Sequence, residues 1–372
     1  MQRDFHYYAI AVLARAAGFS SRDALIIAYA SQYVDDSTEG SLTPLAVQGA
    51  DLRFDPVRTA YSGLQIGRSI RWSEQKRVWI PFHFLPARPF QAQENPTFSF
   101  VTVPDSSFGR WLLSQASSEP IANYRYRLCR IGVALHTYAD SWSHEGFSGR
   151  HSPAENDVEE IEILDRPTLM WIKLRVENFL FDLLPRIGHA EAGFLPDLAY
   201  LQWRYRARGK SAPRIERDNV DRFSAAAAAI YGQLVAIGKR DPAEPIPWEG
   251  IAPGIRQLLA GEPVTRASIL DRLTLSGYQV QQALDLEQRC EHWKRAFGHL
   301  FRPYPPGAAY HYDRRDWRSQ ALEGDVDWDR YSTRQWETMA PRQPKRGFWD
   351  SLWVHFHRAA LRQRHLVLEN LP

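Results

Sequence analysis

Residues 130–152 read RIGVALHTYADSWSHEGFSGRHS, and this stretch decides the predicted fold. Its apolar residues recur at helical spacing, which predicts a buried helix over residues 120–147. His136, Asp140 and His144 follow one another at steps of four residues. Because each residue turns a helix by about 100°, these three side chains span about 80° of arc and point the same way. Polar side chains on one face of a packed helix need partners.

This polar stripe has the donor atoms of a metal site. Imidazole nitrogens and carboxylate oxygens are the usual zinc ligands where no thiolate is present. A carboxylate between two histidines can also bridge two ions. Gly132 and Cys129 continue the stripe with small side chains, so another segment could approach the helix there. The alternative to a metal site is a hydrogen-bonded His–Asp–His relay, which is also usually functional.

The composition is that of a soluble globular chain and excludes several classes of protein. Hydrophobic residues make up 44% and charged residues 24% of the 372 residues, and the formal charge is only +3. Cys129 and Cys290 are too few for a disulfide framework or a thiolate zinc site. Because the first residues lack a cleavage signal and no run of about 18 apolar residues occurs, we predict a cytoplasmic protein without a transmembrane segment.

Helical periodicity recurs along the chain and predicts a mainly α fold, a multi-helix bundle with long loops. Residues 1–300 would form a helical metal-site domain, with a loop-rich insertion at 40–118 that holds a short β-hairpin of strands 68–72 and 76–84. Residues 301–372 would form a C-terminal wrap and an amphipathic helix packed on the same domain. Helices are expected at 4–17, 22–35, 167–184, 218–240, 265–275, 278–300 and 347–368.

The predicted N-terminal hairpin brings more candidate ligands together. Asp4 and His6 lie at the start of its first helix, and Asp35 and Asp36 lie at the end of its second. The helix dipole disfavours carboxylates at a helix C-terminus, and a bound cation would offset this. A solvated acidic helix end is an equally good interpretation of Asp35 and Asp36.

Three further histidines are candidates from their surroundings. His83, in VWIPFHFLPA, lies among bulky apolar residues and must satisfy its ring nitrogens by metal ligation or core hydrogen bonds. His189 follows a helix stop and has Glu191 and Asp197 close by in the sequence. His151 lies in a polar loop, where a solvated side chain and a ligand are equally good interpretations.

These motifs resemble known families. HTYADSWSHEGF, residues 136–147, resembles the central helix motif of the zinc-dependent phospholipase C and single-strand nuclease superfamily, and ASQYVD, residues 30–35, resembles its early helix. The chain is more closely similar to a bacterial family of unknown function whose members share DFHYY, YASQYVDD, PFHFLP, HTYADSWSH and GH…PD. That similarity covers roughly residues 1–205 and names no reaction.

The superfamily resemblance implies packed helices around two or three zinc ions, and hydrolysis of phosphate esters. It implies that Asp140 bridges the ions and that His6 matches an early histidine. Asp35, His83 and His136 would complete one zinc site, and His144 and His189 would serve the other.

The chain departs from the superfamily pattern at three places. Three residues, not five, separate Asp140 from His144. The secreted enzymes use a free N-terminal Trp amine as a ligand, for which Asp4 is the substitute here, so a third ion stays open. Gly193 stands where the superfamily has a carboxylate, with Glu191 and Asp197 near it.

The sequence therefore predicts a metal-dependent hydrolase with Asp140 and Asp36 as catalytic carboxylates. Phosphodiesters, phospholipids, nucleotides and single-stranded nucleic acid are the candidate substrates. Zinc is favoured by the resemblance, and manganese, iron or nickel would suit the same donors. The chain has no Gly-x-Ser-x-Gly elbow, Walker loop or dinucleotide motif. The alternative is a non-enzymatic, metal-stabilised helical module that binds a partner through its aromatic C-terminal helix.

Overall fold

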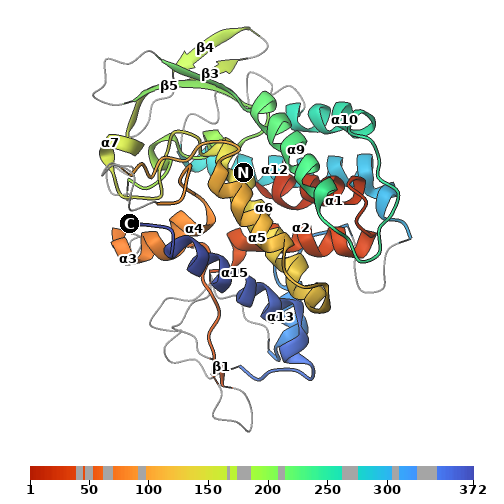
Figure 1. Cartoon of the computed structure of the whole chain (residues 1–372). Helices are drawn as coiled ribbons and strands as arrows, with labels where there is room; N and C mark the ends of the chain where they lie inside the picture. The colour runs from red at the N-terminus through yellow and green to blue at the C-terminus, as the bar shows by residue number, and fades with distance from the viewer. Residues whose placement is uncertain are drawn as a thin grey trace.

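Helices build most of the molecule, and a small antiparallel sheet lies at one end (Figure 1). The computed structural model describes residues 1–38, 45–46, 53–61, 70–90, 98–165, 168–173, 186–207, 214–261, 275–303, 310–324 and 342–372. Its longer helices are α1 (Ile10–Ala16), α2 (Ser21–Asp36), α5 (Ser107–Ser117), α6 (Tyr124–Ser143), α9 (Asn219–Ala236), α10 (Trp248–Ala260), α12 (Leu275–Phe297) and α15 (Leu352–Leu368). A π-helical segment, Asp4–Ala9, leads into α1. The mainly α prediction is confirmed.

Helix α6 is the central element, because α2, α5, α9 and α15 all pack against it. Nearly every side chain from Arg127 to Ser143 is buried, so this helix has almost no solvent face. The predicted helix of residues 120–147 is confirmed, but α6 ends at Ser143, four residues earlier than predicted. Helix α15, drawn in dark blue in Figure 1, begins at Leu352 and buries Trp353, Phe356 and Ala360.

Gly132 sets how closely α2 approaches α6, as its place on the small-residue stripe predicts. A Cβ atom at this position would lie 2.4 Å from the carbonyl oxygen of Ile27 and 2.6 Å from the Cβ of Ala30. Real Cβ atoms do not approach other atoms so closely, so any larger residue must separate the two helices.

Replacing Gly132 by Ala is therefore expected to lower the free energy of unfolding by about 1–3 kcal/mol, the usual cost of overpacking a core. Gly232→Ala in α9 is the matched control, because its added methyl group would meet nothing within 4 Å. That change should stabilise the protein by up to about 1 kcal/mol. Urea denaturation of both variants tests the pair, and equal effects would contradict the close α2–α6 contact.

The sheet has the strand order β4-β3-β5-β6, with every neighbouring pair antiparallel. Its strands are β3 (Val158–Asp165), β4 (Met170–Lys173), β5 (Gln202–Ala207) and β6 (Ile215–Asp218). One face packs Ile161, Ile163 and Trp203 into a second core with Phe84 and Phe147. A separate pair joins β1 (Leu45–Ala46) to β2 (Arg53–Phe54).

The sheet corrects the helix predicted over residues 167–184. Met170–Lys173 is a strand, because its backbone pairs in register with Glu162–Asp165 of β3. Tertiary pairing overrides helical periodicity in such a short apolar run. Residues 174–185, and the predicted helix of 265–274, lie outside the described part of the chain.

The short hairpin predicted within residues 68–84 is also wrong where the structure describes it. Residues 72–82 are helical, in the consecutive segments α3 (Trp72–Glu74), Gln75–Trp79 and α4 (Ile80–Phe82). Pro81 is the second residue of α4 and lies near the end of this helical run, which stops at Phe82. A short run of apolar residues does not distinguish a helix from a strand by periodicity alone.

The other segments largely follow the predictions. The helices predicted at 4–17, 22–35, 218–240 and 278–300 correspond to α1 with its π-helical lead, α2, α9 and α12. The remaining short helices are α7 (Pro153–Asn156) and α13 (Asp316–Ala321). None of the described helices is long and apolar enough to cross a membrane.

Candidate metal centre

Asp140 lies at the centre of a buried cluster at the C-terminal half of α6. Its side chain is 1% exposed. Oδ1 accepts a hydrogen bond of 2.7 Å from the Met1 amino group and lies 3.0 Å from His6 Nε2. Oδ2 lies 3.2 Å from both His83 Nδ1 and His136 Nε2. Each carboxylate oxygen therefore faces its own set of nitrogens.

One side of Asp140 holds a group made of Asp35, His83 and His136. Asp35 Oδ1 lies 3.5 Å from His136 Nε2 and 3.9 Å from His83 Nδ1, and these two nitrogens are 3.3 Å apart. His6, His136 and Asp140 form an overlapping group, in which the two imidazole rings stack at 3.9 Å. Both groups have the donor types and closeness to hold a metal ion.

The other side holds His144, His189 and Asp197, which form a third group able to hold a metal ion. His144 Nε2 lies 3.2 Å from Asp197 Oδ1, and His189 Nε2 lies 3.4 Å from Asp197 Oδ2. The Met1 amino group donates to the same Asp197 oxygen at 3.0 Å. This amino group therefore joins the third group to Asp140.

The end of α6 explains how a three-residue gap after Asp140 serves the third group. His144 is the first residue past the helix, with φ −94° and ψ 11°. Its Nδ1–H donates to the carbonyl oxygen of His83 at 2.8 Å, which turns Nε2 toward Asp197. Asp197, eight residues after His189, supplies the carboxylate beside His189 that Gly193, which has no side chain, cannot supply.

Backbone carbonyls orient three of the imidazoles. His83 Nε2 donates to Thr59 O at 2.9 Å, and His189 Nδ1 donates to Gly193 O at 2.7 Å, as His144 does to His83 O. A carbonyl only accepts, so each of these outer nitrogens carries hydrogen. Metal-ligating histidines commonly have such an outer hydrogen bond, which fixes the ring and its tautomer.

The electrostatics of the cluster lower the pKa values of several imidazoles and of the Asp140 and Asp197 carboxylates, whereas burial raises the pKa of Asp35. Burial lowers the pKa values of His6, His136 and His189 to about 4 each. Burial opposes ionisation of Asp140, but the Met1 ammonium group and the nearby imidazoles outweigh it and hold its pKa well below the usual value. Neutral imidazoles beside ionised carboxylates are the protonation states that metal binding requires.

The structure places the other predicted residues outside these three groups. The Asp4 carboxylate accepts a hydrogen bond of 2.7 Å from Arg289. Asp36 accepts from the Tyr312 hydroxyl at 2.6 Å and from Gln32 at 3.1 Å. Glu191 accepts from the Val158 backbone at 2.7 Å.

Sequence reasoning left some residues of the centre undecided or unnoticed. The role of His151 was left open; it is exposed, belongs to none of the three groups, and its backbone N–H donates to the Gln75 side chain. Asp197 was open as a ligand, although the spaced motif GH…PD signals its link to His189. The roles of Ser143, which accepts from the Met1 amino group at 3.2 Å, and of the Thr59 carbonyl have no sequence signal.

Comparison with known proteins gives a family but no activity. The chain belongs to a family of unknown function, DUF6765, whose model matches residues 1–371. Membership in a family of unknown function was predicted, and the match extends well beyond the expected residues 1–205. No curated protein and no solved structure matches the chain, so the comparisons establish no link to phospholipase C or the single-strand nucleases.

Proposed function

We propose that this chain is a metal-dependent hydrolase of phosphate esters with two ions, one on each side of Asp140. The observation that supports the proposal most is a contact between two hydrogen-bond acceptors in the third group, His189 Nε2 and Asp197 Oδ2. His189 is neutral at pH 7, and its outer nitrogen carries the hydrogen, so Nε2 faces Asp197 as an acceptor at 3.4 Å. Two facing acceptors repel each other unless a cation lies between them.

The donor geometry favours two ions rather than three. His136 Nε2 belongs to both groups on its side of Asp140, and one nitrogen binds one ion. Asp35, His83 and His136 would therefore hold the first ion, and His144, His189 and Asp197 the second. Asp140 would contribute to both, since it lies 3.2 Å from His83 and His136 and 3.7 Å from His144. His6, whose ring stacks on the His136 ring, would contact Asp140 through its Nε2 at 3.0 Å.

Asp35 is the most exposed carboxylate of the three groups, although it is partly buried. The Asp35 side chain is 32% exposed, whereas His136 and Asp140 are almost fully buried. Structural zinc sites are closed, and catalytic sites keep a position open for water or substrate. Asp35 would therefore lie where substrate enters, and Asp140 would stay shielded from solvent.

A pair of bound divalent ions stabilises charge on a phosphoryl oxygen and makes water a nucleophile at neutral pH. The protein's part is to hold the ligands still. Backbone carbonyls fix His83, His144 and His189, and burial lowers the pKa values of His6, His136 and His189, which favours their neutral, metal-binding form. We propose zinc as the resident metal, with manganese, iron or nickel as alternatives.

A substrate panel tests this function with protein of measured metal content. The panel holds a phosphodiester, a phosphomonoester, a phospholipid, a nucleotide and single-stranded nucleic acid. We expect turnover of at least one class that is lost on chelation and restored by zinc. Full metal occupancy without turnover of any class would contradict the hydrolase and favour a metal-stabilised binding module.

Asp35 and Asp36 are adjacent carboxylates, and replacing each in turn tests which of them binds metal. Asp35→Asn should remove one of two ions and lower turnover, because a neutral amide is a poor ligand for a divalent cation. Asp36→Asn should keep both ions, since Asp36 bonds Tyr312 and Gln32 instead. Elemental analysis gives the ion count, and the turnover of Asp36→Asn tests its predicted catalytic role. Loss of metal from Asp36→Asn alone would reverse the assignment.

A further inference from the structure

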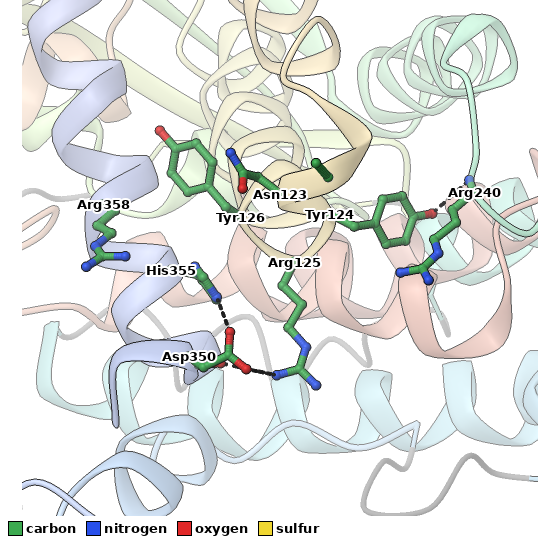
Figure 2. A pocket seen from close by; sticks show the side chains of 9 residues that line it. Asn123, Tyr124, Arg125, Tyr126, Arg240, Asp350, His355 and Arg358 are labelled. Carbon is green, nitrogen blue, oxygen red and sulfur yellow. Dashed lines mark hydrogen bonds and ion pairs between the residues drawn. The ribbon is translucent and has the colours of Figure 1, made fainter. Parts of the chain in front are cut away.

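The ion pairs outside the metal centre differ greatly in burial. Figure 2 shows an exposed one at the first turn of α6, where Arg125 lies 3.2 Å from Asp350 and the two side chains are 48% and 79% exposed. The pair between Arg289 on α12 and Asp4 is only 8% and 3% exposed. A buried guanidinium group is costly unless it is paired and hydrogen-bonded, so its partners indicate what it does.

Arg289 binds the N-terminal segment at two places. Its Nε donates to Asp4 Oδ2 at 2.7 Å, and its Nη2 donates to the side-chain oxygen of Gln2. The other Asp4 oxygen accepts from the Phe5 backbone at 3.1 Å. A guanidinium group carries its donors in a rigid planar fork, so two acceptors on one segment hold that segment in one orientation.

The segment that Arg289 holds also carries His6 into the metal centre. Asp4 and His6 are two residues apart in the π-helical segment, so their side chains point to different sides of it. Asp4 faces α12, whereas His6 faces α6, where its Nε2 lies 3.0 Å from Asp140 Oδ1. A shift of Asp4 would therefore move His6 relative to Asp140.

Arg289 also contacts the segment that carries a residue of the third group. Its guanidinium carbon lies 5.2 Å from the centre of the Tyr200 ring, within the range of a cation–π contact. Tyr200 is three residues after Asp197, which lies 3.2 Å from His144 and 3.4 Å from His189. Through Asp4 and Tyr200, Arg289 therefore joins the segment of His6 to the segment of Asp197.

We propose that Arg289 is a positioning residue of the metal centre, which holds the segments of His6 and Asp197 at a fixed separation. This inference rests on the proposed pair of ions but not on hydrolysis. Asp197 belongs to the group of the second ion, whereas the group of the first ion comes from α2, α6 and the residue after α4. Loss of the Arg289 contacts should therefore weaken binding of the second ion far more than binding of the first.

A zinc titration of the full chain against a chromophoric chelator, which gives a dissociation constant for each ion, tests the proposal. Arg289→Lys keeps the positive charge, but one ammonium group replaces the fork that bonds Asp4 and Gln2. The second ion should bind at least tenfold more weakly in this variant, and the first should keep its affinity. His189→Ala, which lacks a ligand of the second ion, identifies the constant that belongs to that ion. Arg125→Lys, at the exposed pair of Figure 2, is the matched control and should change neither constant.

A second variant removes the buried ion pair as a whole. Asp4→Leu with Arg289→Met leaves no unpaired charge, and replacing a buried pair by apolar residues is often neutral for stability. It should weaken the second ion as Arg289→Lys does. Equal weakening of both ions, or an unchanged second ion in both variants, would overturn the role of Arg289 and leave the metal centre in place. Wild-type protein that binds no zinc would overturn the metal centre and this inference together.

Discussion

Replacing Asp140 by Asn is expected to remove at least one of two bound ions and to lower phosphate ester hydrolysis by about a thousandfold. Asp140 lies 3.2 Å from His83 and His136 on one side, and the Met1 amino group that donates to it also donates to Asp197 of the third group. Metal ions supply several kcal/mol of transition-state stabilisation, and each 1.36 kcal/mol is a factor of ten in rate. Elemental analysis and turnover of the same preparation measure both effects.

Asp23→Asn is the control for this prediction. Asp23 is a buried carboxylate on α2 that accepts a hydrogen bond of 2.9 Å from the Tyr124 hydroxyl and belongs to none of the three groups. Its replacement should lower stability while metal content and turnover per folded molecule stay unchanged. The central role of Asp140 would be wrong if both variants kept two ions and full activity.

Removing the metal should lower the melting temperature by about 5 °C for each ion lost. An ion present at 1,000 times its dissociation constant stabilises the folded state by about 4.1 kcal/mol. The unfolding entropy of about 2.1 cal/mol/K per residue, over 372 residues, converts this energy into a shift of about 5 °C. Without the ions, His189 Nε2 and Asp197 Oδ2 face each other as acceptors at 3.4 Å.

Thermal unfolding before and after chelation, with the metal content measured each time, tests this prediction. Adding zinc back should restore the original melting temperature. Asp140→Asn should show a smaller shift, because it has fewer ions to lose. An unchanged melting temperature in protein shown to be free of metal would mean that the cluster is held together by protons and hydrogen bonds alone.

Local periodicity predicted the core of the fold and the centre of the site. The stripe of His136 and Asp140 follows from helical spacing, and the small Gly132 on that stripe does mark the contact with α2. His83 was a candidate because a histidine among apolar residues needs a partner. These predictions rest on residues close together in the sequence, where helix geometry is sufficient.

The remaining features depend on where elements end and on contacts between distant segments. The role of His144 follows from the end of α6 at Ser143, which the apolar pattern placed four residues too late. Asp197 joins His189 through a turn that no periodicity describes. Residues 170–173 became a strand because β3 was available to pair with them.

Anomalous X-ray diffraction from crystals of the metal-loaded protein tests the central claim most directly. We predict two peaks, one among Asp35, His83 and His136 and one among His144, His189 and Asp197, with Asp140 between them. The absence of both peaks, in protein that elemental analysis also finds free of metal, would contradict the metal centre and leave a hydrogen-bonded His–Asp relay in its place.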